Sequence, residues 1–434
     1  MANYKIDKTQ ELCEKLYLAA KKSKTRRFHA LYDKIHRMDF LESAWEQVKR
    51  NKGSAGIDGV SITDIIDYGE KTYLQELHDL LLDTHKYHPQ KVKQVTIPKP
   101  DGRQRILGIP TVKDRIVQTA TKRILEPIFE ADFLECSYGF RPNRSPHDAL
   151  EEIRIWTNEG YKYVLKADIS GCFDEINHQR LLEFVSQRIN DRKILKLIRK
   201  WLERGCINQT ELKGTPQGSP ISPLLANIYL HEFDKLWMKQ KVVEGKLIRY
   251  ADDFVILFKT EQDAKVGLRL AKIKMEGLNL TLKAEKTTIA NMNGGKEGFD
   301  FLGFHLRQAM SCKYKKRYTN KWPGNKAMTE IRGKIRDVLS PRSKLPLSLK
   351  ELVEQLNPIL RGWRSYFRFG NSHKKFAAID SYVHELLALW WSKKHRKVGR
   401  RWSTAFDYKT YVKSGVVRMS GNIQHWSKHS NAQG

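Results

Sequence analysis

The pattern of apolar and polar positions predicts a β-hairpin at residues 247–258. The runs 247–250 and 254–258 hold branched and aromatic residues with hardly a break, which is typical of strands buried on both faces. Between them, Asp252 and Asp253 belong to a tight turn, so both carboxylates are expected at the tip of the hairpin. Paired carboxylates repel each other unless a cation lies between them. The hairpin therefore predicts metal ligands, with a solvated Asp-Asp turn as the alternative.

A second carboxylate follows the same kind of pattern. Asp168 stands at the end of the apolar run 163–169, and Ser170-Gly171 separates this run from a helix-like segment. Mg²⁺ favours hard oxygen ligands, usually one or two carboxylates plus substrate phosphates, and two-metal sites activate an attacking hydroxyl and stabilise a leaving oxygen. Asp168 and Asp252 from neighbouring strands would supply such a site. The alternative for Asp168 is the N-cap of the following helix.

The pattern becomes helical beyond Asn293-Gly294-Gly295 and the basic stretch 311–326. Ser348-Leu349-Lys350-Glu351 is a capping-box sequence that predicts the start of a helix. An apolar stripe at helical spacing then predicts a further packed helix: Phe376, Ile379, Val383, Leu386, Leu387 and Trp390. Pattern alone thus supports an α+β part up to about residue 310, followed by helices.

Between these two helices, residues 360–368 interleave cations with aromatic residues. Arg361, Trp363 and Arg364 would suit contacts with phosphates and stacking on bases. The alternative is that the aromatic residues belong to the core.

Composition indicates the kind of ligand. The 434 residues contain 79 Lys and Arg against 49 acids, a formal net charge of +30. The sequence pI is about 9.8. Basic clusters recur at 21–27, 313–318 and 393–397. A charge of this size, spread along the chain, predicts a long polyanion such as nucleic acid, with an affinity that falls steeply with salt.

Other features of the sequence exclude several classes. No apolar run reaches the length of a membrane span, and the first residues do not form a secretory signal, so we expect a cytosolic protein without a membrane partner. Five separated cysteines without a C-x-x-C pair argue against disulfides or a zinc site. The chain has no phosphate-binding loop of the ATPase type.

Several motifs, in this order and spacing, resemble the palm of reverse transcriptases, and more specifically bacterial group II intron reverse transcriptases, or maturases. The palm motifs are Asp168-Ile169 with Phe173, residues 214–220 (Gly-Thr-Pro-Gln-Gly-Ser-Pro) and residues 250–253 (Tyr-Ala-Asp-Asp). Further matches lie at residues 98–105, 107–111, 138–142, 299–304 and 361–363. The likeness covers roughly residues 35 to 395, and its specificity comes from the combination.

The resemblance implies a role for each acid of the palm. Asp168 and Asp252 would hold two Mg²⁺ ions, for which Mn²⁺ could substitute, and the backbone carbonyl of Ile169 would be a further ligand. Asp253 would support the site. Catalysis would then consist mostly of positioning and charge neutralisation during an in-line phosphoryl transfer.

The resemblance also implies contacts with the incoming nucleotide. Lys99 and Arg105 match residues of the fingers that grip the triphosphate, with a solvated basic strand pair as the alternative. Gln217 falls where the family's motif contacts the nucleotide. Phe173, five residues after the metal-binding Asp168, would exclude a 2′-hydroxyl and so favour deoxynucleotides, although it could also be an ordinary core residue.

The remaining assignments concern proton transfer and nucleic acid. Lys286 is the candidate for a general acid that protonates pyrophosphate, and Lys283 is too close in sequence to exclude. Lys52 and Gly53 belong to a segment, 51–59, that resembles the N-terminal extension of these enzymes, where template and primer end are held; a plain glycine-rich loop is the alternative. Arg141, within the 138–142 match, is a further expected contact with nucleic acid.

The implied architecture is a right hand of the α+β class: an N-terminal extension at 1–75, fingers and palm with an antiparallel sheet at 76–310, an all-helical thumb at 311–395 and a short basic tail at 396–434. In the tail, Trp402, Phe406, Tyr408 and Tyr411 are expected nucleic-acid contacts. No cluster suited to a nuclease follows Lys394, so the sequence resembles the compact members that lack an endonuclease.

The function implied is RNA-directed DNA synthesis together with binding of a group II intron RNA to assist splicing and retrohoming. The partners would be an RNA template, a DNA primer, deoxynucleoside triphosphates, the intron RNA and target DNA. Two alternatives stay open at this point: an RNA-binding maturase without catalysis, and a domesticated reverse transcriptase in phage defence or DNA repair. Intact Asp168, Asp252 and Asp253 favour retained catalysis, because clustering such charges is unfavourable without a cation.

Overall fold

The computed structural model describes residues 8–83, 85–98, 102, 104–205, 212–310, 315–397 and 406–420. Backbone proximity divides the chain into two compact units. The first comprises residues 1–145, 167–256 and 265–288, and the second comprises 146–166, 257–264 and 289–434. Each unit thus combines segments that are far apart in the sequence, and each is described on its own.

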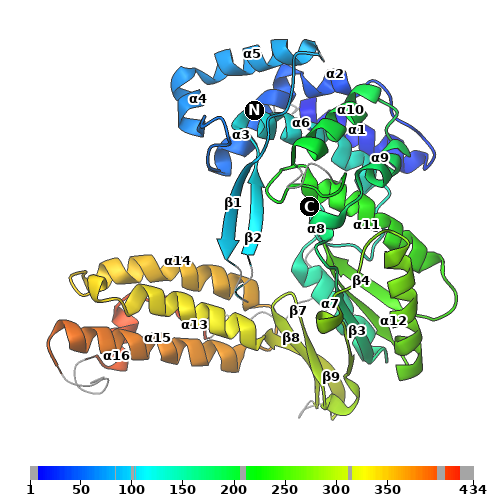
Figure 1. Cartoon of the computed structure of the whole chain (residues 1–434). Helices are drawn as coiled ribbons and strands as arrows, with labels where there is room; N and C mark the ends of the chain where they lie inside the picture. The colour runs from blue at the N-terminus through cyan, green and yellow to red at the C-terminus, as the bar shows by residue number, and fades with distance from the viewer. Residues whose placement is uncertain are drawn as a thin grey trace, which may run out of the picture. The chain divides into compact units, whose positions relative to one another are not determined.

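Helices make up most of the first unit (Figure 1). Their bounds are α1 Lys8–Lys22, α2 Tyr32–Ile35, α3 Met38–Arg50, α4 Ile62–Tyr68, α5 Glu70–Leu82, α6 Val112–Glu130, α8 Cys172–Glu175, α9 His178–Ser186, α10 Arg192–Gly205 and α11 Ser222–Lys239, with the 3₁₀ turn η1 at Ala284–Lys286. Helix α12 (Glu261–Glu276) belongs to this unit from residue 265 onward. Helices α6 and α11 are the most deeply buried, and α6 packs against both α1 and α3. These two helices therefore form the core of the unit.

The described strands form three sheets. Strands β1 (Lys93–Pro98) and β2 (Gln104–Ile109) make an antiparallel ribbon in which Lys93 pairs with Ile109. Strands β3 (Tyr163–Asp168), β4 (Lys246–Tyr250), β5 (Asp253–Phe258) and β6 (Thr288–Asn291) form a four-stranded sheet in the order β4-β5-β3-β6. The hairpin and the buried strand predicted from the sequence are thereby confirmed, and β5 and β3 are neighbours.

The third sheet belongs to the second unit. It is antiparallel in the order β7 (Gly298–Phe301), β8 (Phe304–Met310) and β9 (Arg317–Pro323). Helix α7 (Pro146–Asn158) packs on β9, and Thr157 and Thr319 share a buried hydrogen bond of 2.8 Å. The 3₁₀ turns η2 (Asn293–Gly295) and η3 (Arg342–Lys344) complete the short elements of this unit.

Three helices lie side by side in the second unit, where the sequence predicts a helical thumb (Figure 1). They are α13 (Asn325–Leu339), α14 (Leu349–Phe367) and α15 (His373–Lys394), followed by the short α16 (Tyr408–Lys413). The predicted capping box is confirmed: Ser348 accepts from the N–H of Glu351, and Glu351 accepts from the N–H of Ser348. The predicted stripe on α15 is buried, except for a half-buried Leu386.

Two expectations about this region are wrong. The helical part does not begin at residue 311, because β9 occupies Arg317–Pro323. Its buried positions include Thr319 and Lys321, so no apolar alternation marks the strand in the sequence. In the predicted tail, Phe406 and Tyr411 are buried rather than available to nucleic acid. Trp402 lies outside the described residues, and the linear domain boundaries stay a prediction.

The described helices include none that is both long and apolar enough to cross a membrane.

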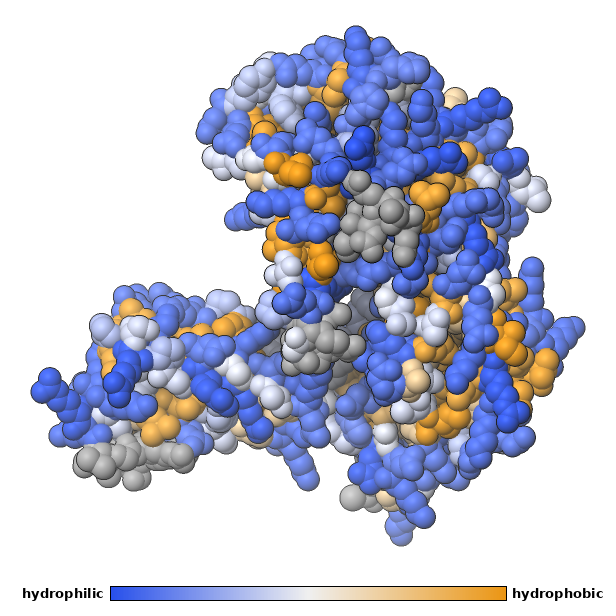
Figure 2. Space-filling model, viewed as in Figure 1, coloured by the Kyte–Doolittle hydropathy of each residue, from blue (hydrophilic) through white to orange (hydrophobic). Residues whose placement is uncertain are grey.

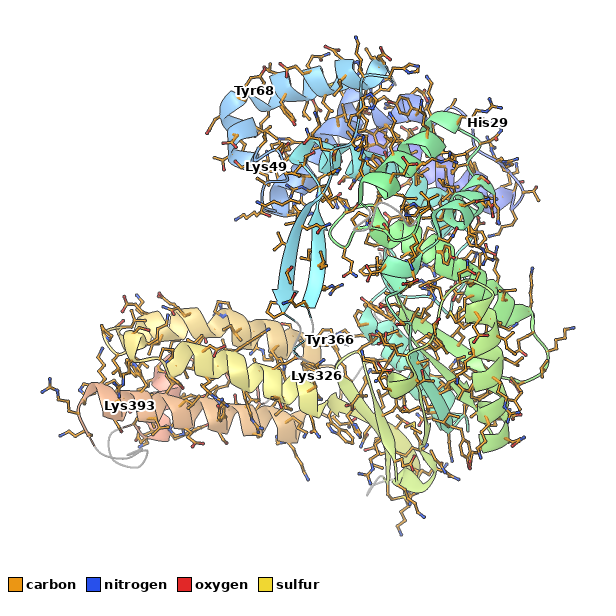
Figure 3. The ribbon with its side chains drawn as sticks, viewed as in Figure 1. His29, Lys49, Tyr68, Lys326, Tyr366 and Lys393 are labelled. Carbon is orange, nitrogen blue, oxygen red and sulfur yellow. The ribbon has the colours of Figure 1, made fainter. Side chains whose placement is uncertain are left out.

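An aromatic cluster joins the strands of the second unit to its helices. His147 of α7 lies 4.7 Å from Phe369 and 5.9 Å from Phe304 between ring centroids. Tyr366, at the end of α14 (Figure 3), donates to the carbonyl of Leu302 at 2.9 Å. Burial and, to a smaller extent, the positive charge of Lys321 together lower the pKa of His147 to about 4. The imidazole is therefore neutral in the folded protein at pH 7.

The buried His147 predicts a loss of stability in mild acid. Its pKa of about 4 lies below the ordinary value of 6.5, so the unfolded chain binds the proton more tightly. Stability is then lost as the pH falls from about 6.5 to about 4. Between pH 7 and 5 we expect the free energy of unfolding to fall by about 2 kcal/mol more in the wild type than in His147→Phe. Urea titrations at both pH values measure this. An equal fall in both proteins would refute it, and His373→Phe, at an exposed histidine, serves as control.

Candidate active site

Asp168 lies at the buried end of β3. Its backbone carbonyl accepts from the N–H of Lys283 at 2.9 Å, and Ser170 donates to the carbonyl of Thr281 at 2.8 Å, so the segment 281–283 is aligned along the strand end. The N-cap of α8 is Gly171, which makes no side-chain capping bond. The capping alternative for Asp168 is therefore wrong, and its carboxylate faces Lys283 and Lys286 instead.

The predicted hairpin presents Asp252 in its turn. Strand β4 ends at Tyr250 and β5 begins at Asp253, which leaves Ala251 and Asp252 as the turn. Ala251 has φ = 56°, a left-handed conformation that is unfavourable for a residue with a Cβ. Asp252 is only partly exposed, and burial raises its pKa. The solvated-turn alternative does not fit these facts.

A buried polar network supports this turn from below. Arg249 of β4 is fully buried and forms a two-pronged ion pair with Asp234 of α11, at 2.8 and 2.6 Å. The same guanidinium donates to the carbonyl of Ala251 at 3.0 Å and to Asn227 at 3.1 Å. Burial disfavours the charge of Arg249, but Asp234 outweighs this, so the pKa of Arg249 is raised. Arg249 therefore connects the turn at Ala251 to α11 through its bonds to both.

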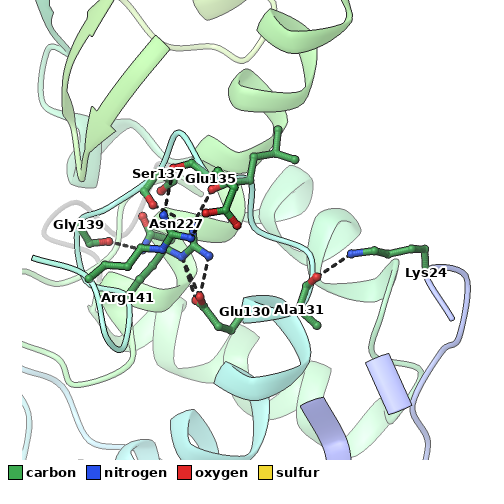
Figure 4. A network of polar contacts seen from close by, with 10 residues as sticks. Lys24, Glu130, Ala131, Glu135, Ser137, Gly139, Arg141 and Asn227 are labelled. Atoms are coloured by element: carbon green, nitrogen blue, oxygen red, sulfur yellow. Dashed lines mark hydrogen bonds and ion pairs between the residues drawn. The ribbon is translucent and has the colours of Figure 1, made fainter. Parts of the chain in front are cut away.

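A backbone contact from another loop completes the support. Asn227 donates to the carbonyl of Gly139 at 2.8 Å (Figure 4). A Cβ at Gly139 would lie 2.3 Å from the backbone nitrogen of Ala251, far inside contact distance. Only glycine lets this loop approach the turn so closely. Sequence reasoning missed Arg249, Asp234 and Asn227. The available signal was a charged residue, Arg249, inside a run read as buried, because such a charge requires a buried partner.

The two acids of the site have opposite pKa shifts. Burial disfavours the ionised form of Asp168, but hydrogen bonds from Lys286 (2.7 Å) and Lys283 (2.9 Å) outweigh it and lower its pKa. Burial raises the pKa of Asp252, and the negative charge of Asp168 adds to this, while Lys283 and Arg105 oppose it. The carboxylates are therefore close enough to repel each other. A cation between them would relieve that repulsion.

The donor set fits magnesium better than a softer metal. Among the described residues, no group of three or more His, Cys, Asp and Glu side chains could hold a metal ion by itself. Mg²⁺ is commonly bound by one or two carboxylates completed by water and substrate phosphates, which matches Asp168 and Asp252. Ile169 is fully buried and paired with Leu282, so its carbonyl as a ligand stays a prediction.

The nucleotide-contact candidates Arg105 and Gln217 lie together. Arg105 of β2 donates from Nε to the side-chain oxygen of Gln217, and the N–H of Gly108 donates to the backbone carbonyl of Gln217 at 2.9 Å. Gly218 has φ = 125° and lies so close to Gly108 that a Cβ would be 2.9 Å from its carbonyl oxygen. The ribbon β1–β2 is thereby fixed to the loop 214–218. Lys99 lies outside the described residues.

Phe173 is half-buried beside the same loop. Its carbonyl accepts from the N–H of Thr215 at 2.7 Å, and Gly214 donates to the carbonyl of Ile176 at 2.8 Å. These bonds hold the backbone of Phe173 beside the loop that carries Gln217. Asp174, which follows, is exposed and contacts Gln217 at 3.5 Å.

Arg141, predicted to contact nucleic acid, is structural instead. Its side chain is 2% exposed and pairs with Glu130 at 2.6 Å (Figure 4). It also donates to the carbonyls of Leu134 and Ser137 at 2.6 and 2.8 Å. All of these partners hold the loop that contains Gly139, so Arg141 has no free donor face for a phosphate and acts on the site only through that loop.

The other nucleic-acid candidates differ in accessibility. Lys52 is exposed, and Gly53 lies against Arg115, which donates to the carbonyl of Ser54 and anchors the loop on α6. Arg361 is exposed on α14, whereas Arg364 donates to the carbonyl of Arg418 at 3.1 Å.

Trp363 packs on Phe367 and Phe376, with ring centroids 4.7 and 5.5 Å apart, as the core alternative describes.

Hydrophilic residues cover most of the visible face of the molecule, with small apolar patches between them (Figure 2).

Comparisons with known proteins agree with this arrangement. The family model described as "Reverse transcriptase (RNA-dependent DNA polymerase)" matches residues 97–306, and that described as "Group II intron, maturase-specific domain" matches residues 328–406. The first range contains both acids and the nucleotide-contact candidates. The second contains α14 and α15.

Several individual proteins are similar to this chain in sequence. The chain is 33% identical to protein YkfC of Escherichia coli in an alignment of 360 residues that covers 73% of this chain and 93% of that protein. It is 38% identical over 220 residues to the group II intron-encoded protein LtrA of Lactococcus lactis, covering 50% of this chain and 36% of LtrA. The nuclear intron maturase 1 of Arabidopsis thaliana is 28% identical over 191 residues, covering 31% of this chain and 27% of that protein.

Proposed function

This chain belongs to the group II intron reverse transcriptase and maturase family, and on that basis we propose that it copies RNA into DNA by two-metal-ion nucleotidyl transfer at Asp168 and Asp252. The observation that carries the proposal is the approach of these two acids, one from the end of β3 and one from the β4–β5 turn. Bound Mg²⁺ would activate the primer hydroxyl and stabilise the leaving pyrophosphate.

The residues around the acids have complementary roles in this proposal. Arg105, which lies near the loop end of the β1–β2 ribbon and donates to Gln217, binds the triphosphate of the incoming nucleotide. Lys283 and Lys286 balance the charge of Asp168 before substrate binds, and Lys286, whose side chain is 46% exposed, would act as the general acid toward the leaving pyrophosphate. Asp253 supports the hairpin at the first position of β5.

The maturase-specific match supports binding of intron RNA by the second unit. Exposed Arg361 on α14 lies within the matched range and is available for a phosphate contact. We propose that this RNA binding assists splicing and directs retrohoming into target DNA. The chain spans about a third of LtrA, so these activities of the whole protein stand as proposals here.

The test is magnesium-dependent extension of a DNA primer on an RNA template, with deoxynucleotides or ribonucleotides offered separately. Extension with deoxynucleotides alone, lost when the divalent metal is chelated and restored by Mg²⁺ or Mn²⁺, supports the proposal. Salt-sensitive RNA binding without extension under either condition would indicate a maturase without polymerase activity.

Phe173 provides a sharper prediction for the same assay. The ring is half-buried and the backbone of Phe173 is held by the bond from Thr215, and we expect the ring to collide with a 2′-hydroxyl. We expect Phe173→Ala to increase ribonucleotide relative to deoxynucleotide incorporation roughly 10- to 100-fold, the range typical of rejection by shape. Phe173→Tyr keeps the ring and serves as the control. Equal discrimination by Phe173→Ala and the wild type would exclude the steric role.

A further inference from the structure

Helix α10 of the first unit carries a row of cations that the proposed reaction does not use. It contains six cationic residues and one acid, Glu203. Arg192, Lys196 and Lys200 recur every four residues and so lie on one face of the helix. In an isolated helix such like charges repel one another. The row spans about 12 Å along the helix axis, since each residue adds about 1.5 Å.

This face borders a hollow of about 160 Å³. Arg192, Lys193, Lys196 and Lys200 line it on one side, and the rings of Tyr32 and Tyr87 on the other. The tyrosine hydroxyls point inward to other partners: Tyr32 donates to the carbonyl of Leu81 at 3.0 Å, and Tyr87 donates to Asp114 at 2.6 Å. Both tyrosines are almost fully buried, so they form walls and offer no free face for a base.

Among the described residues, none of these four cations forms an ion pair with a carboxylate within 4 Å. The ion pairs of the described residues involve other lysines, arginines and histidines. The nearest acid on the chain, Asp191, accepts from the backbone N–H groups of Leu31, Tyr32, Lys193 and Ile194 and caps the helix. Lys200 donates to the carbonyl of Tyr87 at 3.1 Å and to Nδ1 of His88 at 3.4 Å, and neither partner carries a negative charge. Burial and the charges of Lys196 and Arg204 lower the pKa of Lys200. An anion would relieve this repulsion.

We propose that this hollow is a phosphate-binding site for an RNA strand, with Arg192, Lys193, Lys196 and Lys200 contacting successive phosphates. A row of about 12 Å is longer than one phosphate group and favours a polymer over a free anion. Because the aromatic walls are covered, recognition goes through the backbone and is independent of base sequence. The inference deepens the proposed function, since it takes RNA as the ligand, and it assigns none of the catalytic residues.

The test is binding of a labelled single-stranded RNA oligonucleotide to the full chain, without nucleotides, at several salt concentrations. Arg192→Ser/Lys196→Ser removes two exposed cations that have no ion-pair partner among the described residues. We expect a Kd roughly 10- to 30-fold higher at about 0.1 M salt, and a slope of log K against log salt smaller by about 1.4. The control, Lys272→Ser/Lys274→Ser on α12, removes the same charge from the same unit and should change both quantities little.

Equal weakening by the two double variants would overturn the proposal, because only the net charge would then matter. Binding of a free nucleoside triphosphate, measured by calorimetry, separates the two sources of phosphate. If the wild type binds it and Arg192→Ser/Lys196→Ser does not, the hollow is a nucleotide site and the RNA assignment is wrong. Two RNAs of different sequence should bind alike. The binding assay measures no DNA synthesis. Its failure would therefore contradict only the RNA site on α10, whereas failure of primer extension would contradict the proposed polymerase function.

Discussion

Asp252→Asn is expected to abolish DNA synthesis while leaving the protein at least as stable as the wild type. Asparagine keeps the size of the side chain but removes the charge that would bind a divalent cation. The rate of primer extension should fall at least about a thousandfold, which corresponds to about 4 kcal/mol of lost transition-state stabilisation. Burial raises the pKa of Asp252, so its ionised form disfavours folding at pH 7 when no metal is bound. Removing that charge should therefore not lower the melting temperature of the metal-free protein.

The measurement combines single-turnover extension with thermal unfolding in a chelator, and adds a splicing assay with intron RNA. Splicing assistance should persist, since it rests on RNA binding and not on the metal site. Asp79→Asn, at an exposed carboxylate on α5, is the control and should change none of the three. Loss of both synthesis and splicing assistance in a well-folded Asp252→Asn protein would contradict the separation of the two functions.

The parts of the site that the sequence predicts are those encoded by local pattern. Mostly apolar runs predicted β3, β4 and β5, and with them the positions of Asp168 at a strand end and Asp252 in a turn. Strand ends and tight turns are local properties, since a polar residue that interrupts a buried run must lie where the strand leaves the core. The capping box at Ser348 is local in the same sense.

The predictions that failed concern side-chain partners. Arg141 carries the residue type of a phosphate contact, but Glu130 and two backbone carbonyls surround it. Trp363 packs on Phe367 and Phe376, as the core alternative describes, while its side chain is only half-buried and its contact with nucleic acid stays a prediction. A cation or an aromatic residue has the same letter in the sequence whether its partner is a protein group or a nucleotide. Only tertiary contacts separate the two cases.

Strand β9 was missed for a related reason. Its inward positions hold Thr319 and Lys321. Thr319 shares a hydrogen bond with Thr157, and Lys321 lies 3.8 Å from Glu151. Burial of polar residues is possible there only because α7 supplies partners from another part of the chain. A pattern of apolar alternation cannot reveal a strand whose inner face is polar.

Arg249→Met is expected to destabilise the first unit by roughly 3 to 5 kcal/mol, because it leaves Asp234 buried without its partner. The double variant Arg249→Met/Asp234→Leu removes both charges and should recover most of that stability. It should not recover activity, since the carbonyl of Ala251 loses its donor and the turn that carries Asp252 is no longer held. We expect kcat to fall roughly 10- to 100-fold, with little change in the KM for the primer–template.

Recovered stability together with a reduced kcat would show that Arg249 positions the turn that carries Asp252, in addition to stabilising the fold. The matched control is Arg188→Met/Asp132→Leu, which replaces another ion pair of the same unit, formed by buried Arg188 and partly exposed Asp132 at 3.1 Å, with no bond to the hairpin among the bonds that Arg188 makes. If the control loses as much kcat as the Arg249 and Asp234 double variant, the effect is general loosening of the unit. If only the Arg249 and Asp234 double variant loses kcat, the geometry of Asp252 depends on Arg249, which holds the turn in which Ala251 has an unfavourable left-handed conformation.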